Sequence, residues 1–206
     1  MPAVASRPPA AAAQIELFDA SRPLPDGLVY QRDFISPDEE AALLASFAQL
    51  PFEEARYKEW TARRRVVSYG SRYDFGDNQL RTAPPMAGFL LPLRERAARW
   101  VGVAPDDFTD ALIAEYRPGT QLGWHRDVPQ FEGVVGISLA SECRMRFRPY
   151  PPRADKREDV FALTLEPRSA YVLERAARWR WQHMIPPTPA LRYSITFRTR
   201  VTRRRA

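Results

Sequence analysis

The chain has 206 residues and a net charge of +6, from 31 Lys and Arg against 25 Asp and Glu, and its length suits one domain with a full hydrophobic core. Its single cysteine, Cys143, excludes a disulfide-rich scaffold, a cysteine zinc finger and an iron–sulfur protein, and favours a reducing compartment, which we take to be the cytoplasm. No apolar run is long enough to span a bilayer, and any imidazole chemistry must use His125 or His183, because the chain has two histidines.

Residues 1–14 are mostly alanine and proline, with one arginine and no acidic residue. This composition predicts a disordered tail, and an organelle transit peptide is the alternative. One domain then covers residues 15–202. Its first helix is predicted to begin after Ser36, which suits the N-cap position, with Glu39 completing a capping box, and to end near Gln49.

Residues 52–84 interleave aromatic and arginine side chains. Within this segment, residues 66–69 favour a strand, and the remainder is typical of a loop or hairpin. A second helix is predicted over residues 86–101, because large apolar residues recur at helical spacing along one face. We expect Gly102 to end that helix.

Six short segments of the C-terminal half alternate between apolar and polar residues with a period of two. Proline, glycine and charged turns separate them, which predicts the antiparallel strands of a sandwich or barrel. Two helices followed by such strands favour an α+β protein whose helices cover one face of a double sheet. The predicted strands cover residues 112–116, 134–140, 144–147, 160–165, 170–173 and 193–199.

His125 and Asp127 are two residues apart in an extended segment, so their side chains project from the same side. His183 follows much later in the chain, after several predicted strands. Two imidazoles and one carboxylate from two segments are the ligand set of a non-heme iron(II) facial triad with open positions. Taken alone, the His-x-Asp pair has an alternative: a surface histidine near a salt-bridged aspartate.

Residues 191–198 read Leu-Arg-Tyr-Ser-Ile-Thr-Phe-Arg, in which large apolar residues alternate with polar ones. On a strand, Arg192 and Arg198 share a face with the two hydroxyl side chains between them, and the apolar side chains face the other way. Near a metal site, this inward polar face with two cations would suit a dicarboxylate. An edge strand with solvent-facing arginines is the alternative.

Together these motifs resemble the AlkB family of iron(II)- and 2-oxoglutarate-dependent dioxygenases. The resemblance covers about residues 112–199, and the arginine pair after a His-x-Asp…His triad separates this family from most oxygenases of the same fold. The motifs are Tyr116-Arg117-Pro118-Gly119, His125-x-Asp127, Ser169-Ala170-Tyr171-Val172-Leu173, Trp181-Gln182-His183 and the strand at 192–198. The resemblance implies a double-stranded β-helix, or jelly roll, with buttressing N-terminal helices and a nucleotide-recognition lid at residues 52–84.

By this resemblance, the metal ligands and catalytic residues are His125, Asp127 and His183, which bind iron(II). Arg192 pairs with the distal carboxylate of 2-oxoglutarate, and Arg198 and Tyr116 complete the cosubstrate site. The implied reaction uses dioxygen, releases succinate and carbon dioxide, and removes an alkyl group from a base as an aldehyde.

The sequence departs from the family pattern at two places. Ala114 stands where the family often has asparagine, two residues before the tyrosine, which puts one cosubstrate hydrogen bond in doubt. Residues 128–130 lack the acidic residue that base demethylases carry after the His-x-Asp motif. This second departure leaves the base specificity open.

Within the predicted lid, we expect Trp60, Tyr69 and Tyr73 to contact bases or the nucleic-acid backbone, and Arg64 with its two arginine neighbours to contact phosphates. Packing of these aromatic side chains on the sheet is the alternative. Arginine makes up nearly all of the basic residues, which favours nucleic acid or an anionic substrate, although GC-biased coding gives the same bias. The arginines at 203–205 would add a nonspecific phosphate contact or form a frayed terminus.

Three hypotheses follow. The first is an oxidative dealkylase of alkylated bases in DNA or RNA, acting in repair, as a monomer with no membrane partner. The second is the same oxygenase chemistry, hydroxylation or demethylation, on a protein or a small molecule. The third is a non-catalytic jelly roll that binds nucleic acid.

Overall fold

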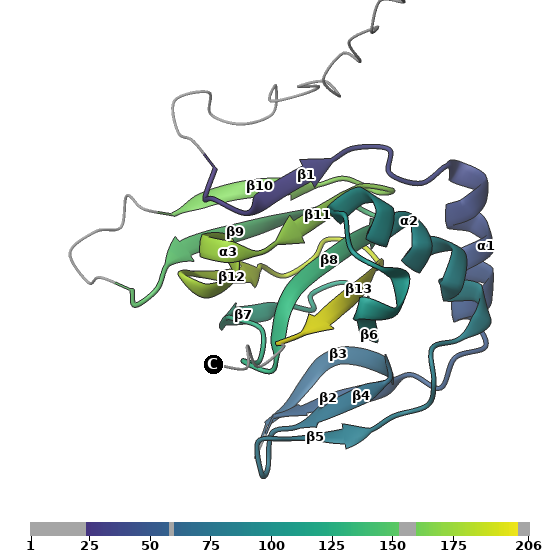
Figure 1. The fold of residues 1–206 in the computed structure, drawn as a ribbon, viewed down its shortest axis with the longest axis horizontal. Helices are drawn as coiled ribbons and strands as arrows, with labels where there is room; N and C mark the ends of the chain where they lie inside the picture. The colour runs from purple at the N-terminus through teal and green to yellow at the C-terminus, as the bar shows by residue number, and fades with distance from the viewer. Residues whose placement is uncertain (1–23, 58–59, 153–159, 202–206) are drawn as a thin grey trace, which may run out of the picture.

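The computed structural model describes residues 24–57, 60–152 and 160–201 (Figure 1). The predicted tail at residues 1–14 and the arginines at 203–205 lie outside these ranges, and the side chain of Trp60 is likewise outside the described part. Within the described ranges, no helix is long and apolar enough to cross a membrane.

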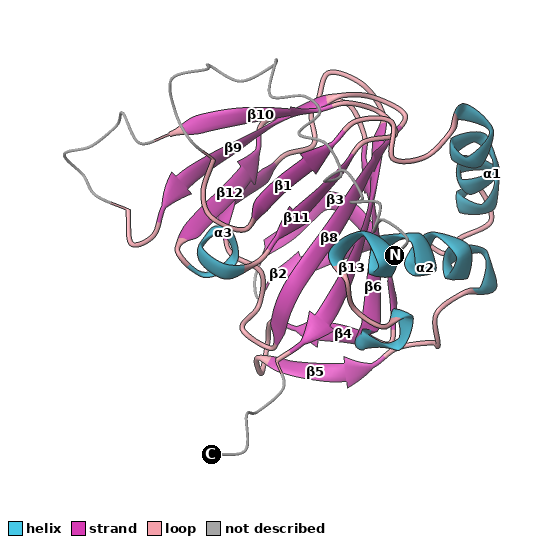
Figure 2. Cartoon of the chain, turned by 45° about the horizontal axis from the view of Figure 1, so that its top comes forward, coloured by secondary structure: helices cyan, strands magenta, loops and turns pink. Residues whose placement is uncertain are grey.

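Short helices and many strands make up the described chain, and Figure 2 shows how they are distributed. The helices are α1 (Pro37–Phe47), η1 (Gly88–Leu90), α2 (Leu91–Val101), η2 (Pro105–Asp107) and α3 (Arg175–Trp179). The strands are β1 (Leu28–Gln31), β2 (Glu53–Tyr57), β3 (Trp60–Tyr69), β4 (Ser71–Asp74), β5 (Gln79–Thr82), β6 (Phe108–Tyr116), β7 (Leu122–His125), β8 (Phe131–Leu139), β9 (Cys143–Pro149), β10 (Phe161–Leu165), β11 (Ala170–Leu173), β12 (Trp181–Ile185) and β13 (Arg192–Arg200).

The strands form two main sheets. One has seven strands in the order β1-β11-β8-β13-β6-β3-β2, and the other has four in the order β10-β9-β12-β7. Every pairing in both sheets is antiparallel. Strands β4 and β5 form a separate hairpin, which lies beside β2 and β3 at the bottom of Figure 1.

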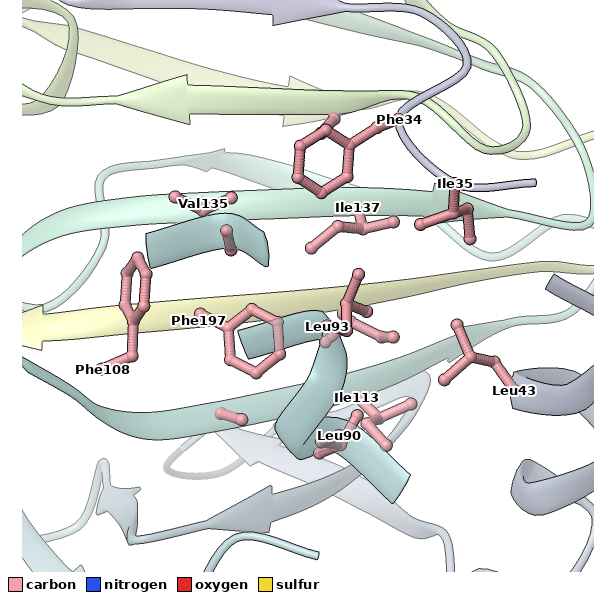
Figure 3. Packing of buried hydrophobic residues seen from close by; sticks show 14 of the residues in the cluster. Phe34, Ile35, Leu43, Leu90, Leu93, Phe108, Ile113, Val135, Ile137 and Phe197 are labelled. Carbon is pink, nitrogen blue, oxygen red and sulfur yellow. The ribbon is translucent and has the colours of Figure 1, made fainter. Parts of the chain in front are cut away.

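One hydrophobic core lies between the seven-stranded sheet and the helices (Figure 3). Leu43 of α1 and Leu93 of α2 pack toward Ile113, Ile137 and Phe197, which project from three neighbouring strands. Those three sheet residues are fully buried. Since burying one such side chain stabilises a fold by about 1.5–3 kcal/mol, this core holds the helices against the sheet.

A second core lies between the two sheets. It joins Tyr171 and Val134 of the seven-stranded sheet to Met145, Phe147 and Leu163 of the four-stranded sheet. Helices on one outer face and a second sheet on the other agree with the predicted α+β arrangement of a double sheet with buttressing helices.

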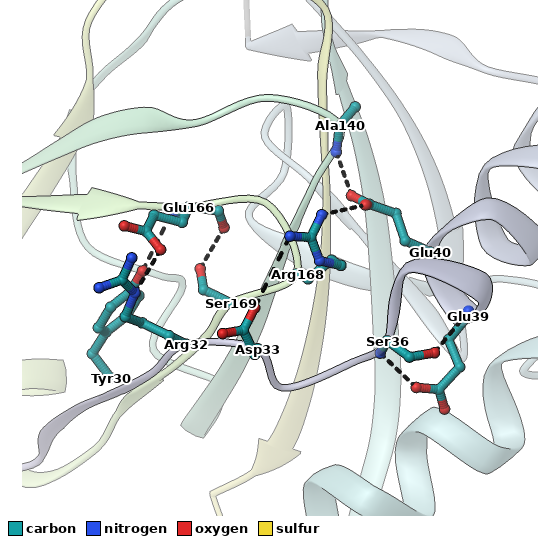
Figure 4. Close-up of polar contacts among 10 residues, drawn as sticks. All are labelled: Tyr30, Arg32, Asp33, Ser36, Glu39, Glu40, Ala140, Glu166, Arg168 and Ser169. Atoms are coloured by element: carbon teal, nitrogen blue, oxygen red, sulfur yellow. Dashed lines mark hydrogen bonds and ion pairs between the residues drawn. The ribbon is translucent and has the colours of Figure 1, made fainter. Parts of the chain in front are cut away.

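Helix α1 begins at the predicted capping box (Figure 4). The Ser36 Oγ accepts a hydrogen bond from the Glu39 backbone N–H at 3.2 Å, and the Glu39 carboxylate accepts one from the Ser36 N–H at 2.8 Å. The buried carboxylate of Glu40 accepts hydrogen bonds from the Ala140 N–H at 2.8 Å and from Arg168 at 3.1 Å. These contacts fasten the start of the helix to the turns at one end of the sheets.

The second helix is shorter than the predicted span of residues 86–101. A 3-10 turn over Gly88–Leu90 precedes α2, which begins at Leu91. Pro92 lies in the first turn of α2, where a backbone N–H has no acceptor within the helix, so the missing N–H of proline costs no hydrogen bond. The predicted stop is present: Gly102 has a φ of 75°, and its N–H donates to the carbonyl of Ala98.

The segment at residues 52–84 is mostly strand. The predicted strand at 66–69 is the end of the longer β3, and the remainder forms antiparallel pairs, as the hairpin alternative predicted, rather than loop. Strand β3 pairs with β6, with Val66 opposite Ala114, and thereby joins the large sheet. The arginines of β3 made the strand hard to recognise from the sequence, because a long side chain can pack its apolar stem in the fold while its charge stays at the surface. Gly70 separates β3 from β4, and with a φ of 77° its missing Cβ would lie 2.1 Å from the Thr109 carbonyl oxygen.

Candidate metal and cosubstrate site

A cavity opens between the two sheets, and the three predicted metal ligands and three predicted cosubstrate residues all line it. Five of them come from four strands of the two sheets, β6, β7, β12 and β13, and Asp127 lies in the segment that follows β7. These six residues are Tyr116, His125, Asp127, His183, Arg192 and Arg198.

The pairing of β12 with β7 brings the two histidines together. His183 lies opposite His125 in the register, and the centroids of the two rings are 4.2 Å apart. Asp127 follows β7 by two residues, and its Oδ2 lies 3.8 Å from the Nε2 of His183. Residues from distant parts of the sequence therefore meet because two antiparallel strands are neighbours.

The site holds its imidazoles neutral and its carboxylate ionised. Burial, together with the neighbouring His125, lowers the pKa of His183 to about 3, and desolvation lowers the pKa of the partly buried His125. Burial alone would raise the pKa of Asp127, but the charge of Arg198 and the two nearby imidazoles outweigh it and hold this pKa below its usual range. Neutral imidazole and ionised carboxylate are the forms that bind a metal.

The tautomer of His125 is also suited to a metal. Its Nδ1 lies 2.9 Å from the carbonyl oxygen of Gly123. A carbonyl can only accept, so the Nδ1–H donates this bond and the Nε2 lone pair is left for a ligand.

The donor atoms are near one another but are not yet in a metal-binding geometry. Among the described residues, no three His, Cys, Asp or Glu side chains are gathered closely enough to hold a metal ion as they stand. The Asp127 Oδ2 and the His183 Nε2 lie 3.8 Å apart. The Nε of Arg198, 3.5 Å from the Asp127 Oδ1, restrains the carboxylate. The donor set fits iron(II) in its chemistry and requires side-chain rotation.

Arg192 supplies the cavity with a buried positive charge. Its side chain is 1% exposed, its Nε donates to the Oγ of Ser138 at 3.2 Å, and its guanidinium carbon lies 5.1 Å from the centre of the Tyr116 ring. Its Nη1 is buried and has no hydrogen-bond partner among the residues that the structure describes. An unsatisfied buried donor of this kind costs about 1–3 kcal/mol, so this guanidinium fits an anionic ligand that completes its hydrogen bonds.

The alternation predicted for residues 191–198 is present in β13. Arg192, Ser194, Thr196 and Arg198 line the cavity, and the residues between them face the helix-side core. Because β13 lies between β8 and β6 in the large sheet, it is not the edge strand of the alternative interpretation.

Two polar residues near the site were not singled out from the sequence. Ser138 contacts Arg192 from the neighbouring strand β8, and Arg178 is 2% exposed and donates to the carbonyl oxygens of Val128 and Phe131. No local pattern distinguishes Ser138 from the other serines. A clue to Arg178 is its position in the predicted strand-rich half, close before His183.

The structure places the residues predicted for the lid in different environments. Arg64 of β3 lines the cavity. Tyr69 was wrongly predicted to contact bases: it is 6% exposed in the helix-side core, and this burial raises its pKa. Tyr69 is an odd number of residues from Arg64, so along a strand it faces the opposite side. Tyr73 lies in the hairpin, where its hydroxyl donates to the Asn78 Oδ1 and its ring is 4.8 Å from that of Phe75.

Known proteins resemble this chain along most of its length. The family model of the 2OG-Fe(II) oxygenase superfamily matches residues 27–198. An Arabidopsis thaliana protein named "Alkylated DNA repair protein ALKBH8 homolog" is 31% identical over 193 residues, which cover 84% of this chain and 54% of that protein. A Xenopus tropicalis protein named "tRNA (carboxymethyluridine(34)-5-O)-methyltransferase alkbh8" is 28% identical over 169 residues, which cover 80% of this chain and 26% of that protein. The chain thus spans about half, or less, of the length of these two relatives.

Among solved structures, that of OsALKBH1 superposes with a TM-score of 0.67 at 14% identity, covering 86% of this chain and 99% of that one. At this identity the likeness concerns the fold alone. It confirms the predicted α+β double-stranded β-helix.

Proposed function

The chain belongs to the 2OG-Fe(II) oxygenase superfamily, with AlkB homologues as relatives, and from this premise we propose that it dealkylates alkylated bases of DNA or RNA by oxidation. As a member, it is a dioxygenase that uses iron(II), 2-oxoglutarate and dioxygen. One observation carries the proposal: the buried Arg192, with an unpaired Nη1, lines the same cavity as two neutral imidazoles and an ionised carboxylate.

In this proposal, His125, Asp127 and His183 hold iron(II), and Arg192 binds the distal carboxylate of 2-oxoglutarate. Bound iron, with 2-oxoglutarate and dioxygen, supplies the oxidant for hydroxylating a C–H bond, and succinate and carbon dioxide are the coproducts. A hydroxylated alkyl group on a base nitrogen then leaves as an aldehyde.

The chain's own residues prepare these steps. Ser138 and the Tyr116 ring fix the guanidinium of Arg192 in one orientation before the cosubstrate arrives. Arg198 keeps Asp127 ionised. Apolar side chains such as Met145 and Ile185 line the same cavity, which limits water around the reacting atoms.

Three observations favour a nucleic acid as substrate. Arg64 reaches the cavity from β3, within the predicted lid, where a cation suits a phosphate. The net charge is +6. The two relatives carry names that refer to alkylated DNA repair and to tRNA modification.

The test is succinate release by the iron(II)-loaded protein with 2-oxoglutarate and a panel of methyl- and etheno-modified DNA and RNA oligonucleotides, single-stranded and duplex. We expect a modified oligonucleotide to stimulate succinate release, with loss of the alkyl group in its mass spectrum. His125→Ala abolishes this coupled turnover, whereas Arg99→Gln, an exposed change on α2, leaves it unchanged. An active enzyme that no nucleic acid stimulates would refute the proposal and favour a protein or small-molecule substrate.

A further inference from the structure

The outer face of the four-stranded sheet carries a row of arginines. In β9, Cys143, Met145 and Phe147 are buried in the core between the sheets. The alternate residues of the strand face away from that core, because side chains of a strand alternate between its two sides. These outward residues are Arg144, Arg146 and Arg148.

Within the described residues, this row lacks the acidic partners that several other arginines have. Within their bounds, strands β10, β9, β12 and β7 contain no Asp or Glu. Among the described residues, no carboxylate lies within ion-pair distance of the three arginines. By contrast, exposed arginines elsewhere form ion pairs, such as Arg81 with Asp77 and Arg175 with Asp26. The outer face is therefore a concentrated positive surface that the described chain does not neutralise.

Aromatic rings hold two guanidinium groups of this surface in place. The guanidinium carbon of Arg148 lies 4.5 Å from the centre of the Trp124 ring, and its Nε donates to the Gln182 Oε1 at 2.8 Å. The guanidinium carbon of Arg126 lies 3.7 Å from the centre of the Tyr150 ring, which is 41% exposed. A guanidinium stacked on a ring already has little conformational freedom, so binding an anion at its edge costs little further side-chain entropy.

The surface lies directly behind the candidate metal site. Trp124 and Gln182 each directly precede one of the histidines in sequence. Strands β7 and β12 therefore carry Trp124 and Gln182 on one side and His125 and His183 on the other. Strand β7 is the edge of its sheet. Strands β12 and β7 therefore have the cavity on one side and this outer face on the other, and they lie between β9 and the edge of the sheet, as Figure 1 shows.

We propose that this arginine face, made of Arg126, Arg144, Arg146 and Arg148 with Trp124 and Tyr150, binds the phosphodiester backbone of a single-stranded nucleic acid that passes over the β7 edge. The proposal rests on the proposed function, since it places the strand that flanks the reacting base. Residues two apart on a strand lie about 6.8 Å apart, a spacing comparable to that of successive phosphates in an extended strand. The exposed ring of Tyr150 and the half-buried ring of Trp124 suit unpaired bases, which stack without regard to sequence.

The test uses Arg144→Gln with Arg146→Gln, both exposed, against a matched control, Arg94→Gln with Arg99→Gln on α2, which removes the same charge from the opposite side of the sandwich. Anisotropy of a labelled, unmodified single-stranded oligonucleotide gives Kd over a series of salt concentrations. We expect the β9 variant to bind about tenfold more weakly at low salt, with its salt slope reduced by about 1.4, since each phosphate contact on a single strand contributes about 0.7. The control binds nearly as wild type does, and the β9 variant keeps the wild-type Tm. The control loses the ion pair between Arg94 and Asp106, so its Tm falls by at most about 2–4 °C.

The outcomes separate the two proposals. If the β9 variant binds like the control while wild type binds and demethylates nucleic acid, the arginine face is refuted and the proposed function stands. If wild type releases succinate with a modified oligonucleotide but does not bind the unmodified single strand, the arginine face is refuted and the proposed function stands; if no nucleic acid stimulates the active enzyme, both proposals are refuted. If poly-glutamate of equal charge competes as well as the oligonucleotide, the face recognises acidic polymers in general, and its assignment to nucleic acid is overturned.

Discussion

Replacing Arg192 by methionine separates the function of this residue from its contribution to the fold. The guanidinium is 1% exposed, and its Nη1 has no hydrogen-bond partner. Methionine fills a similar volume and buries no unpaired donor, so the free energy of unfolding of the cosubstrate-free protein should stay level or rise by about 1 kcal/mol. For a chain of this size, that rise corresponds to a Tm increase of about 2–4 °C.

The same change removes the partner proposed for 2-oxoglutarate. Two charge-assisted hydrogen bonds of about 1.5–3 kcal/mol each are lost, which amounts to at least a hundredfold increase in the KM for 2-oxoglutarate. Arg192→Lys keeps the charge but not the planar fork, so its KM should fall between those of wild type and the methionine variant.

Two assays check this reasoning. Succinate release against 2-oxoglutarate concentration gives the KM, and thermal unfolding with and without 2-oxoglutarate reports binding, since a ligand that binds only the folded state raises Tm. We expect 2-oxoglutarate to raise the Tm of wild type and not that of the methionine variant. A KM within twofold of wild type, or a cosubstrate-free Tm that falls by several degrees, would refute the role given to Arg192.

Four further changes test the fold and the site. Gly136→Ala places a Cβ 2.2 Å from the Tyr171 ring, and urea unfolding should show a loss of about 1–3 kcal/mol. Ser36→Ala removes the cap of α1 and should lower Tm by about 2–4 °C, corresponding to about 1 kcal/mol. Burial would raise the pKa of Asp110, but its paired arginine and two hydroxyl donors lower this pKa overall. The ionised carboxylate therefore stabilises the fold fully above the unfolded-state pKa of about 3.9, and this stabilisation is lost as the pH falls through the folded-state pKa. Urea midpoints measured from pH 7 to pH 3 should consequently fall less steeply for Asp110→Asn than for wild type. Adding iron(II) under anaerobic conditions should raise the Tm of wild type, chelation should reverse this, and His183→Ala should show no change.

Each of these has a contrary result. Unchanged urea unfolding of Gly136→Ala would mean that the Tyr171 ring has room to move, and an unaltered Tm for Ser36→Ala would mean that water replaces the cap. Parallel pH profiles for wild type and Asp110→Asn would place the acid sensitivity elsewhere. An equal shift of Tm by iron(II) in His183→Ala would show that the metal binds at another site.

The sequence was sufficient for the elements whose signals are local. The capping box at Ser36 and the stop at Gly102 depend on residues within one turn of helix, so their positions could be read directly. The alternation at residues 191–198 likewise placed Arg192 and Arg198 on one side of a strand, since the period of a strand is independent of its neighbours. Single motifs therefore predicted which residue types would be available for chemistry.

The extent of the sheet and the orientation of the lid residues depended on pairing between distant segments. Strand β3 is long because β6 and β2 hydrogen-bond to its two edges, and its side-chain parity against β6 sends Arg64 to the cavity and Tyr69 to the core. An aromatic and basic segment carries no local signal for that parity.

The amino-acid sequence by itself determined the ligand types, their spacing and the alternation of the arginine strand, because these follow from residue identity and the geometry of a single strand. Only the tertiary structure decided that His183 lies opposite His125, that Ser138 holds Arg192, and that the arginines of β9 face outward, without acidic partners in the described part of the chain. The physical reason is that strand register and sheet packing join residues far apart in the chain. Burial in the cavity keeps the imidazoles neutral, and the neighbouring charge of Arg198 keeps Asp127 ionised against that burial.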